Sequence, residues 1–371
     1  MRVLGFMTGT SLDAVDMAVL ETDGEAILAF GPAAERKLSP GTRAVCLQAT
    51  MAAQSWTRGD PPPAVFEAVS AAVAREHLLA ATGFLAAEGM RWSDLDLMGM
   101  HGQTVLHQRP RDGVCGRTVQ LGDARWLAAE TGVPVVYDFR SADVAAGGEG
   151  APLAPLYHLA RARASSLKPP VAVLNLGGIA NVTLWTPQDE LVAFDTGPAN
   201  GMLDLLVQAR TSQRFDVDGQ LAAQGRIDEK VLRAYLADAY FLRPPPKSLD
   251  RYDFPLGPLD TLSLADAAAT LLAFTVETIC LGLRQTGGAP GALIVCGGGR
   301  LNPTLMGALR ERLGASVRTA EEVGWRGDFV EAEAFAYLAA RSRLGLPLSL
   351  PGTTGVPAPL TGGRIAYPQR A

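Results

Sequence analysis

Short apolar runs that end in glycine-bearing polar turns recur along the chain, and stretches with helical periodicity lie between them. The runs Arg2–Phe6, Ala172–Leu176 and Gly291–Val295 have the length and composition of buried strands. Apolar residues at helical spacing fill Pro62–Gly89 and Asp266–Thr286. This alternation predicts an α/β protein in which the ligand binds in the crevice outside the strand ends.

The stretch from Asn175 to Asn200 holds the densest group of such turns. Gly177 and Gly178 close one predicted strand, and a later strand leads into Asp195 and a further glycine turn. Glycines let backbone N–H groups approach an anion closely, because no Cβ is in the way. A carboxylate beside a phosphate is electrostatically unfavourable, so Asp195 suggests either an intervening metal ion or a base. A hairpin with an ordinary turn aspartate is the competing interpretation.

The N-terminal segment has the same design. Its first strand turns through Gly9, Thr10 and Ser11, and Asp13 and Asp16 follow. Two turns of one design about 170 residues apart predict two related halves rather than a solenoid. Turn and capping chemistry remains an alternative for the two aspartates.

A third polar corner, His-Gly-Gln-Thr, follows the predicted strand around Trp92–Leu97. His101, Gln103 and Thr104 together suit a hydroxyl-rich ligand, although a histidine at a strand end is more often structural. The segment 138–152 then carries Arg140, Asp143 and three glycines within four residues. Such a segment is a ligand loop or a hinge, with a flexible linker as the alternative.

The last glycine corner, Gly297–Gly299, runs through Asn302 into a predicted helix, Pro303–Leu313. A strand that passes through glycines into a helix N-terminus suits a phosphate or a nucleotide base. The segment is neither a Walker A loop nor a GxGxxG fingerprint. Three glycine corners and Asp195 are what phosphoryl transfer requires, because that chemistry depends on positioning, backbone donors, Mg²⁺ and one proton acceptor.

Composition narrows the class of protein. The chain has 371 residues, of which 48% are hydrophobic, which is enough for two domains. A net charge of −5 without a long basic run argues against nucleic acid or an anionic membrane as the main partner. The four cysteines form no CxxC pair, which is typical of a reducing cytosol. We expect a cytoplasmic protein without a signal peptide or membrane span.

A set of motifs resembles the anhydro-N-acetylmuramic acid kinases over nearly the whole chain. In order, the motifs are MTGTSLDAVD, HGQTV, DFRSADVAAGGEGAPLAP, NLGGIANVT, AFDTGPAN, KSLDRYDF, CGGGRLN and EAEAFAYLA. The resemblance implies a two-domain actin-like ATPase (sugar kinase) fold with an interdomain active-site cleft. It also implies an enzyme that uses ATP and water to open the anhydro sugar of peptidoglycan and to phosphorylate its O6, giving N-acetylmuramic acid 6-phosphate. A homodimer is expected from the resemblance alone.

The resemblance also implies roles for individual residues. Asp195 is similar to the general base that takes a proton from the attacking water. Mg²⁺ is expected on the ATP phosphates, with its protein ligands unassigned. The residues similar to nucleotide contacts are Gly9, Thr10, Ser11, Leu12, Asp13, Ala14, Val15, Asp16, Gly177, Gly178, Gly197, Gly297, Gly298, Gly299 and Asn302. Those expected on the sugar side are Gln103, Thr104, Arg140, Asp143 and Glu331.

The sequence departs from the family pattern at Ala14, Glu149 and Ala199, of which the last two bear on the fit of the muramyl carboxylate. Ala14 and Ala199 stand where glycine is usual, and Glu149 replaces a usual glutamine. Levoglucosan, which lacks the lactyl and acetamido groups, is therefore the alternative substrate, and a catalytically silent nucleotide-binding regulator is a third hypothesis. The predicted N-terminal domain comprises residues 1–137 with about 345–371, and the predicted nucleotide-binding domain comprises 138–344.

Overall fold

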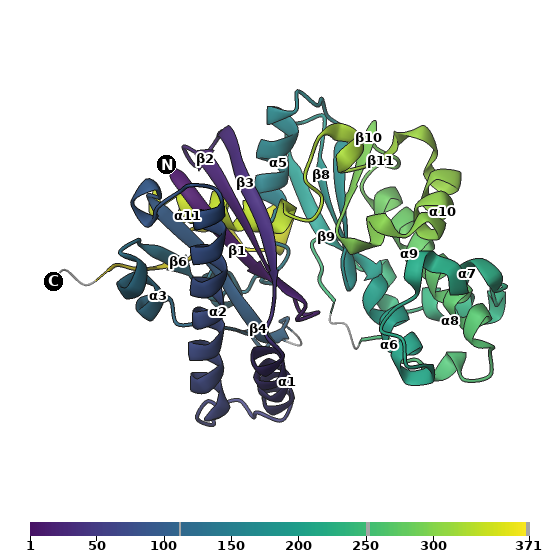
Figure 1. Ribbon diagram of the computed structural model, residues 1–371. Helices are drawn as coiled ribbons and strands as arrows, with labels where there is room; N and C mark the ends of the chain where they lie inside the picture. Colours follow the sequence, from purple (N-terminus) through teal and green to yellow (C-terminus); the bar gives the residue numbers. More distant parts are fainter. Residues whose placement is uncertain (111–112, 250–252, 369–371) are drawn as a thin grey trace. The chain divides into compact units, whose positions relative to one another are not determined.

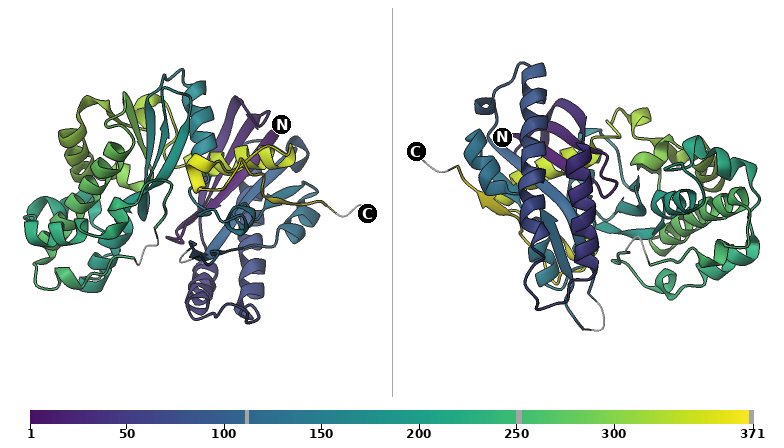
Figure 2. Two further views of the ribbon diagram at one scale, coloured as in Figure 1. Left: turned by 180° about the vertical axis from the view of Figure 1, so that it is seen from behind. Right: turned by 60° about the horizontal axis from the view of Figure 1, so that its bottom comes forward.

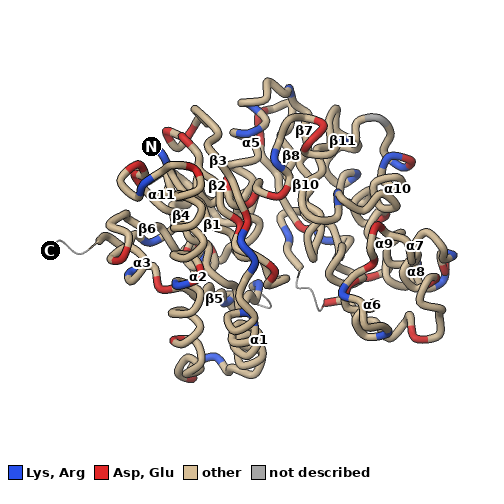
Figure 3. The backbone as a smooth tube through the Cα atoms, viewed as in Figure 1, with Lys and Arg blue, Asp and Glu red and all other residues tan. Residues whose placement is uncertain are grey.

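The computed structural model describes residues 1–110, 113–249 and 253–368. The chain forms two compact units (Figure 1). Unit 1 comprises Met1–Ala164 and Phe329–Ala371, and unit 2 comprises Ser165–Asp328. Acidic and basic residues are interspersed along the backbone of both units (Figure 3).

Unit 1 is built on a mixed sheet in the order β12-β6-β4-β1-β2-β3, with β5 paired to β4. The strands β1, β2 and β3 form an antiparallel meander, whereas β4 and β6 run parallel to β1 and to each other. The strands are β1 Arg2–Thr8, β2 Ala14–Thr22, β3 Ile27–Lys37, β4 Leu97–Gln108, β5 Arg117–Leu121, β6 Val135–Tyr137 and β12 Arg364–Ala366.

Helices cover both faces of this sheet. Leu4 and Phe6 of β1 face a cluster that includes residues of α1 and α2, whereas Gly5 between them faces α11. This alternation follows from the two-residue period of a strand. Figure 2 shows α11, in yellow, lying across the sheet when the molecule is seen from behind. The helices of unit 1 are α1 Pro40–Gln54, α2 Val65–Ala87, α3 Ala124–Thr131, α4 Ser141–Ala145, α5 Pro155–Ala164, α11 Val330–Arg343 and α12 Pro351–Thr354.

Unit 2 has a sheet in the order β11-β10-β7-β8-β9. The strands β7, β8 and β9 form an antiparallel meander, and β10 and β11 continue the sheet in parallel with β7. The strands are β7 Val171–Leu176, β8 Ile179–Trp185, β9 Leu191–Pro198, β10 Ala292–Cys296 and β11 Val317–Thr319. The helices are α6 Asn200–Arg210, α7 Gln220–Gln224, α8 Glu229–Leu236, α9 Leu264–Gln285 and α10 Pro303–Leu313.

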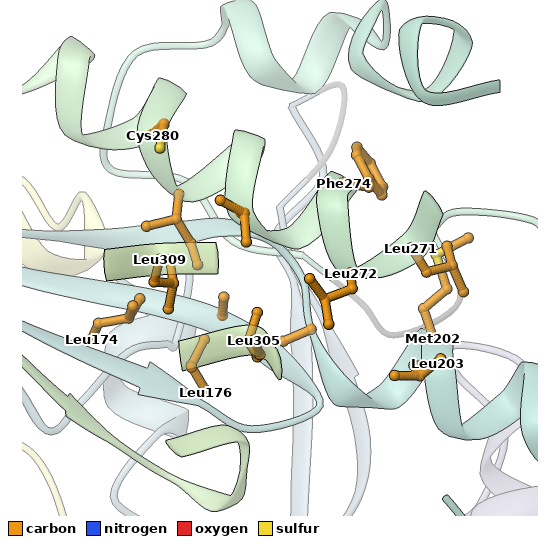
Figure 4. Close-up of a cluster of buried hydrophobic side chains, with 14 of the residues drawn as sticks. Leu174, Leu176, Met202, Leu203, Leu271, Leu272, Phe274, Cys280, Leu305 and Leu309 are labelled. Carbon is orange, nitrogen blue, oxygen red and sulfur yellow. The ribbon is translucent and has the colours of Figure 1, made fainter. Parts of the chain in front are cut away.

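The core of unit 2 is formed between this sheet and its helices. Figure 4 shows the buried side chains of β7, α6, α9 and α10 converging on one cluster. The side chain of Ser263 caps α9 by accepting a hydrogen bond from the amide of Asp266 (3.1 Å). By length and composition α9 could span a membrane, but 72% of its apolar window is buried in the fold. We therefore describe α9 as a core helix.

The two sheets repeat one strand order. The order β3-β2-β1-β4-β6 in unit 1 corresponds to β9-β8-β7-β10-β11 in unit 2, with the same parallel and antiparallel pairings. The predicted internal repeat is therefore confirmed at the level of topology. The α/β fold class is also confirmed, with the two-unit architecture expected of an actin-like sugar kinase.

Several predicted boundaries differ from those in the structure. The units divide after Ala164 and after Asp328, whereas the sequence placed the boundaries at 137/138 and 344/345. The reason is packing, because α11 contacts β1, β2 and β4 and also α5, so these helices belong with unit 1. The C-terminal part of unit 1 also contains the single helical turn α12.

Candidate active site

The first predicted phosphate loop is the tight turn between β1 and β2. The amide of Leu12 donates to the carbonyl of Gly9 (3.1 Å), and Leu12 has a φ of 56°. Thr10, Ser11 and Asp13 are exposed, whereas Leu12 is buried and anchors the turn to the core. A Cβ on Gly9 would be 3.5 Å from its nearest described neighbour, so the backbone is open to a close ligand. The remaining predicted residues of this loop, Ala14, Val15 and Asp16, already belong to β2.

The corner containing Gln103 and Thr104 lies beside this turn within unit 1. Gln103 of β4 is in register with Thr8, the last residue of β1. The Gln103 side chain is 1% exposed, and its Nε2 donates to the carbonyl of Thr104 (3.2 Å). Its Oε1 is buried and has no hydrogen-bond partner among the described residues. A buried acceptor without a partner is costly unless a ligand or water supplies a donor.

His101 and Arg140 form a hydrogen-bonded pair next to this corner. The Arg140 guanidinium donates to His101 Nε2 (3.2 and 3.3 Å) and to the carbonyl of Gly150 (2.7 Å). Burial, together with the charge of Arg140, holds the pKa of His101 well below its usual value. Because arginine can only donate, His101 is neutral, with its proton on Nδ1 facing the carbonyl of Gly102 (2.8 Å).

Asp143 lies at the base of the predicted ligand loop and is 1% exposed. Its Oδ1 accepts from the amide of Gly150 (2.7 Å) and its Oδ2 from the hydroxyl of Thr354 (2.5 Å). Both carboxylate oxygens therefore hold protein groups, which fits a role in shaping the loop better than direct contact with a sugar.

Glu331 lies in the first turn of α11 and is partly exposed. A helix N-terminus favours a carboxylate at this position, because the first backbone N–H groups carry partial positive charge. Glu333, two residues further along α11, is fully buried and accepts a hydrogen bond from the hydroxyl of Tyr157 on α5. Glu331 is therefore the acidic residue of this motif that remains accessible within unit 1.

In unit 2, two predicted glycine corners are close together. The β7–β8 turn at Gly177 and Gly178 accepts hydrogen bonds from the amides of Asn200 and Gly201 (3.1 Å each). The Asn200 side chain donates to the carbonyl of Leu176 (3.0 Å). Its amide also lies against the third corner, since a Cβ on Gly299 would be 3.2 Å from it.

The predicted nucleotide glycines of unit 2 fall into two groups. A Cβ would lie 3.6 Å from the nearest described atom at Gly177, 3.8 Å at Gly178 and 4.0 Å at Gly298, so the backbone there is open. At Gly197 the same atom would lie 2.3 Å from Thr278 of α9, and at Gly299 it would lie 2.6 Å from Leu176. The first group suits close approach of a phosphate or base, and the second group is required by packing.

Two further predicted contacts are also explained locally. Gly297 has a φ of 76°, and a Cβ there would lie 2.3 Å from the side-chain oxygen of Asn175. Asn302 caps α10, because its Oδ1 accepts from the amide of Leu305 (3.0 Å). The strand-to-helix transition predicted here is thus confirmed, with one 3₁₀ turn, η5 Gly298–Leu301, in between.

Asp195 lies in β9, opposite Asn181 of β8, and is 7% exposed. Its Oδ2 accepts from the amide of Leu249 (2.8 Å), and its own amide donates to the carbonyl of Lys247 (2.9 Å). The hydroxyl of Tyr240 donates to its carbonyl (2.5 Å). One carboxylate oxygen is thus held by a backbone amide, and the backbone of Asp195 is itself fixed on both sides, so the side chain has a defined direction, as a positioned proton acceptor requires.

The sequence did not predict that the segment from Lys247 to Leu249 holds Asp195 in place. Lys247 is 2% exposed, and its ammonium donates to the carbonyls of Tyr240 and Arg243 and to the side chain of Gln285 (2.9–3.2 Å). Burial, with a smaller contribution from Arg243, lowers the pKa of Lys247 to about 8. The only available signal was a lysine after a stiff proline run. The rest of that motif, Asp250–Tyr252, lies outside the described residues.

Each unit, taken by itself, has backbone turns that suit the phosphates of ATP. Open backbone turns at Gly9, Gly177, Gly178 and Gly298 are suited to phosphate oxygens. No group of three or more histidine, cysteine, aspartate or glutamate side chains is arranged to hold a metal ion in the part of the chain that the structure describes.

Comparison with known proteins identifies the family of the chain. The family model for anhydro-N-acetylmuramic acid kinase matches residues 1–368. The chain is 64% identical to the anhydro-N-acetylmuramic acid kinase of Phenylobacterium zucineum, with 100% of both chains covered. It is 63% identical to that of Caulobacter vibrioides, with 98% of both chains covered.

Similarity to solved structures is more distant. Component A of (R)-2-hydroxyglutaryl-CoA dehydratase from Acidaminococcus fermentans has 15% identity and a TM-score of 0.47, with 93% of this chain and 99% of that chain covered. A likeness at this level adds nothing to the assignment, which the family match carries. The chain belongs to the anhydro-N-acetylmuramic acid kinase family and is a phosphotransferase of that family.

Proposed function

We propose that the protein opens 1,6-anhydro-N-acetylmuramic acid with water and transfers the γ-phosphoryl group of ATP to O6. The products are N-acetylmuramic acid 6-phosphate and ADP. The single observation that supports this most is Asp195, whose carboxylate accepts a hydrogen bond from the amide of Leu249 in the same unit as two open glycine turns. A regulator that only binds nucleotide has no use for such a carboxylate.

Asp195 serves as the general base. It accepts a proton from a water molecule, and the resulting hydroxide attacks C1 of the sugar while the C1–O6 bond breaks. The electron pair left on O6 attacks the γ-phosphorus, and ADP leaves. One water and one phosphoryl group are thus added to the sugar, and the proton held by Asp195 is released to solvent.

The open turns would hold the triphosphate by backbone N–H groups, with Thr10 and Ser11 adding hydroxyl donors. Mg²⁺ bound to the phosphate oxygens would neutralise charge that builds up during transfer. Because Gly197, Gly297, Gly299 and Asn302 have packing or capping partners, we assign the close phosphate contacts to Gly9, Gly177, Gly178 and Gly298.

On the sugar side, the unsatisfied Oε1 of Gln103 would accept from a hydroxyl or from the acetamido N–H of the substrate. Thr104 and Glu331 would contact further hydroxyl groups. Arg140 is the cation expected to face the lactyl carboxylate, since a guanidinium suits a carboxylate in both charge and geometry. Asp143 acts on the sugar indirectly, through the loop that it holds.

Other parts of the proposal follow from the family. The enzyme would act in the cytoplasm, in recycling of peptidoglycan, and would assemble as a homodimer.

The test is an ADP-release assay with ATP, Mg²⁺ and the anhydro-muramyl sugar in heavy-oxygen water. We expect a product carrying one phosphate and one heavy oxygen at C1. The same assay with levoglucosan is the control for substrate choice. Turnover of levoglucosan alone would overturn the substrate assignment, and absence of ADP release from both sugars, with ATP still bound, would overturn the kinase proposal.

A further inference from the structure

The loop formed by residues 146–150 is fastened to the C-terminal part of unit 1. Asp143 Oδ2 accepts from the hydroxyl of Thr354 (2.5 Å), and Asp143 Oδ1 accepts from the amide of Gly150 (2.7 Å). The amide of Glu149 donates to the carbonyl of Thr354 (2.7 Å). Thr354, the last residue of α12, therefore contacts Asp143 through its hydroxyl and the loop through its carbonyl.

This connection is buried and tightly fitted. Thr354 is 0% exposed and Asp143 is 1% exposed, so water does not replace either partner. A Cβ on Gly148 would lie 2.2 Å from Asp143 Oδ1 and 2.8 Å from Val356, which shows how closely the loop lies on its support. A buried carboxylate that loses one donor keeps an uncompensated desolvation cost, so the loop would rearrange to find another.

The same loop accepts one of the hydrogen bonds that orient Arg140. The guanidinium donates to the carbonyl of Gly150 (2.7 Å), and its other nitrogens contact the neutral ring of His101. A continuous set of hydrogen bonds thus runs from Thr354 through Asp143 and Gly150 to Arg140. None of these hydrogen bonds involves the predicted nucleotide-binding turns.

We propose that Thr354 is a positioning residue for the sugar. Through Asp143 it fixes loop 146–150 and, with the loop, the direction of the Arg140 guanidinium toward the carboxylate of the substrate. The proposal rests on the proposed function, because it requires an anhydro sugar that carries a carboxylate. Levoglucosan has no group for Arg140 to bind, so its use should be much less sensitive to Thr354.

The test compares Thr354→Val with Thr354→Ser in the full-length enzyme. Valine keeps the shape and removes the hydroxyl, whereas serine keeps the hydroxyl. We expect Thr354→Val to raise KM for the anhydro-muramyl sugar by about tenfold while KM for ATP stays within about twofold. Thr354→Ser should restore wild-type values, and any levoglucosan turnover should change little in either variant.

The outcomes separate this inference from the proposed function. If the wild-type enzyme does not turn over the muramyl sugar, the proposed function fails. If the wild-type enzyme is active and Thr354→Val has an unchanged sugar KM, or raises both KM values together, the positioning role is overturned.

A second variant and a second measurement guard against a protein that does not fold. Asp143→Asn keeps the volume of the side chain and should give the same selective rise in sugar KM. Hydrogen exchange at the amides of Glu149 and Gly150 should be faster in Thr354→Val than in Thr354→Ser. Equal protection in both would contradict the proposed link to the loop, whatever the sugar assay shows.

Discussion

Glycine has two different tasks in the turns that the sequence singled out. A Cβ on Gly178 would lie 3.8 Å from its nearest described neighbour, whereas a Cβ on Gly197 would lie only 2.3 Å from the side chain of Thr278. The sequence could not separate these tasks, because both residues follow short strands and both look like phosphate-loop glycines. Only the position of α9 distinguishes a glycine that admits a ligand from one that admits a helix.

Alanine at these two positions should therefore affect different properties, stability at Gly197 and ATP binding at Gly178. Gly197→Ala should lower the free energy of unfolding by about 1–3 kcal/mol, because the added methyl group overpacks the contact with α9. Gly178→Ala should leave stability within about 0.5 kcal/mol of wild type and raise KM for ATP. Denaturant unfolding and initial-rate kinetics measure the two effects. A stable Gly197→Ala variant with weak ATP binding would reverse the assignment.

The carboxylate of Asp195 gives the sharpest test at the scale of one residue. Asn at this position keeps an oxygen to accept from the amide of Leu249 but is no proton acceptor. We expect kcat to fall by about 10²–10⁴-fold, with ATP binding unchanged in calorimetry. Activity close to wild type would exclude Asp195 as the base, and Asp216→Asn, which changes a buried capping carboxylate of the same unit, is the control for nonspecific damage.

At the scale of elements, the sequence predicted most strands and long helices because their apolar periodicity is strong. The sequence marked Gly225 as a helix break, and in the structure this residue ends α7 in close contact with Ala265 of α9. The sequence did not predict α12, whose single turn depends on Pro351 at its start and Gly355, with a φ of 79°, at its end. For the proposed site, it singled out the turns and Asp195 as candidates but not Lys247 or Thr354, whose contacts with Gln285 and with Asp143 are distant in sequence.

Close packing of α11 on the sheet of unit 1 makes a prediction of its own. A Cβ on Gly5 would lie 2.0 Å from the carbonyl oxygen of Ala332, so the helix approaches the strand at backbone distance. Gly5→Ala should destabilise the protein by about 1–3 kcal/mol or more, because a backbone cannot yield as a side chain does.

Gly83→Ala on the exposed side of α2 is the matched control. A Cβ there meets no described atom within 4 Å, so the variant should be neutral or more stable by up to about 1 kcal/mol. Thermal unfolding of both variants measures the difference. Equal midpoints would contradict the packing argument.

For the whole molecule, the distribution of histidine is uneven. All four histidines, His77, His101, His107 and His158, lie in unit 1. Burial lowers the pKa to about 4 for His77 and His107 and to about 3 for His158, and it lowers that of His101 as well. Each is therefore neutral in the folded protein at pH values where the unfolded chain would bind a proton.

Acid should consequently destabilise unit 1 selectively. The pKa values of these histidines in the folded protein lie below the unfolded value of about 6.5. Above that pH their burial therefore costs no stability. As the pH drops toward 4, the free energy of unfolding falls by up to about 1.4 kcal/mol per histidine and pH unit. Hydrogen exchange at pH 7 and pH 5.5 should reveal faster opening of unit 1 than of unit 2 at the lower pH. His77→Gln should reduce the difference, and a uniform loss of protection in both units would contradict the argument.

The interrupted course of unit 1 has a consequence for synthesis on the ribosome. The strands that carry Gly5 and Gly99 have both of their neighbours, β2 and β6, once β6 has emerged, but α11, which packs on them, follows only after the whole of Ser165–Asp328. At about 5–20 residues per second this interval lasts on the order of ten to thirty seconds. During that time unit 2 is a continuous segment able to collapse, while the nascent sheet of unit 1 exposes an apolar face to chaperones and to neighbouring chains.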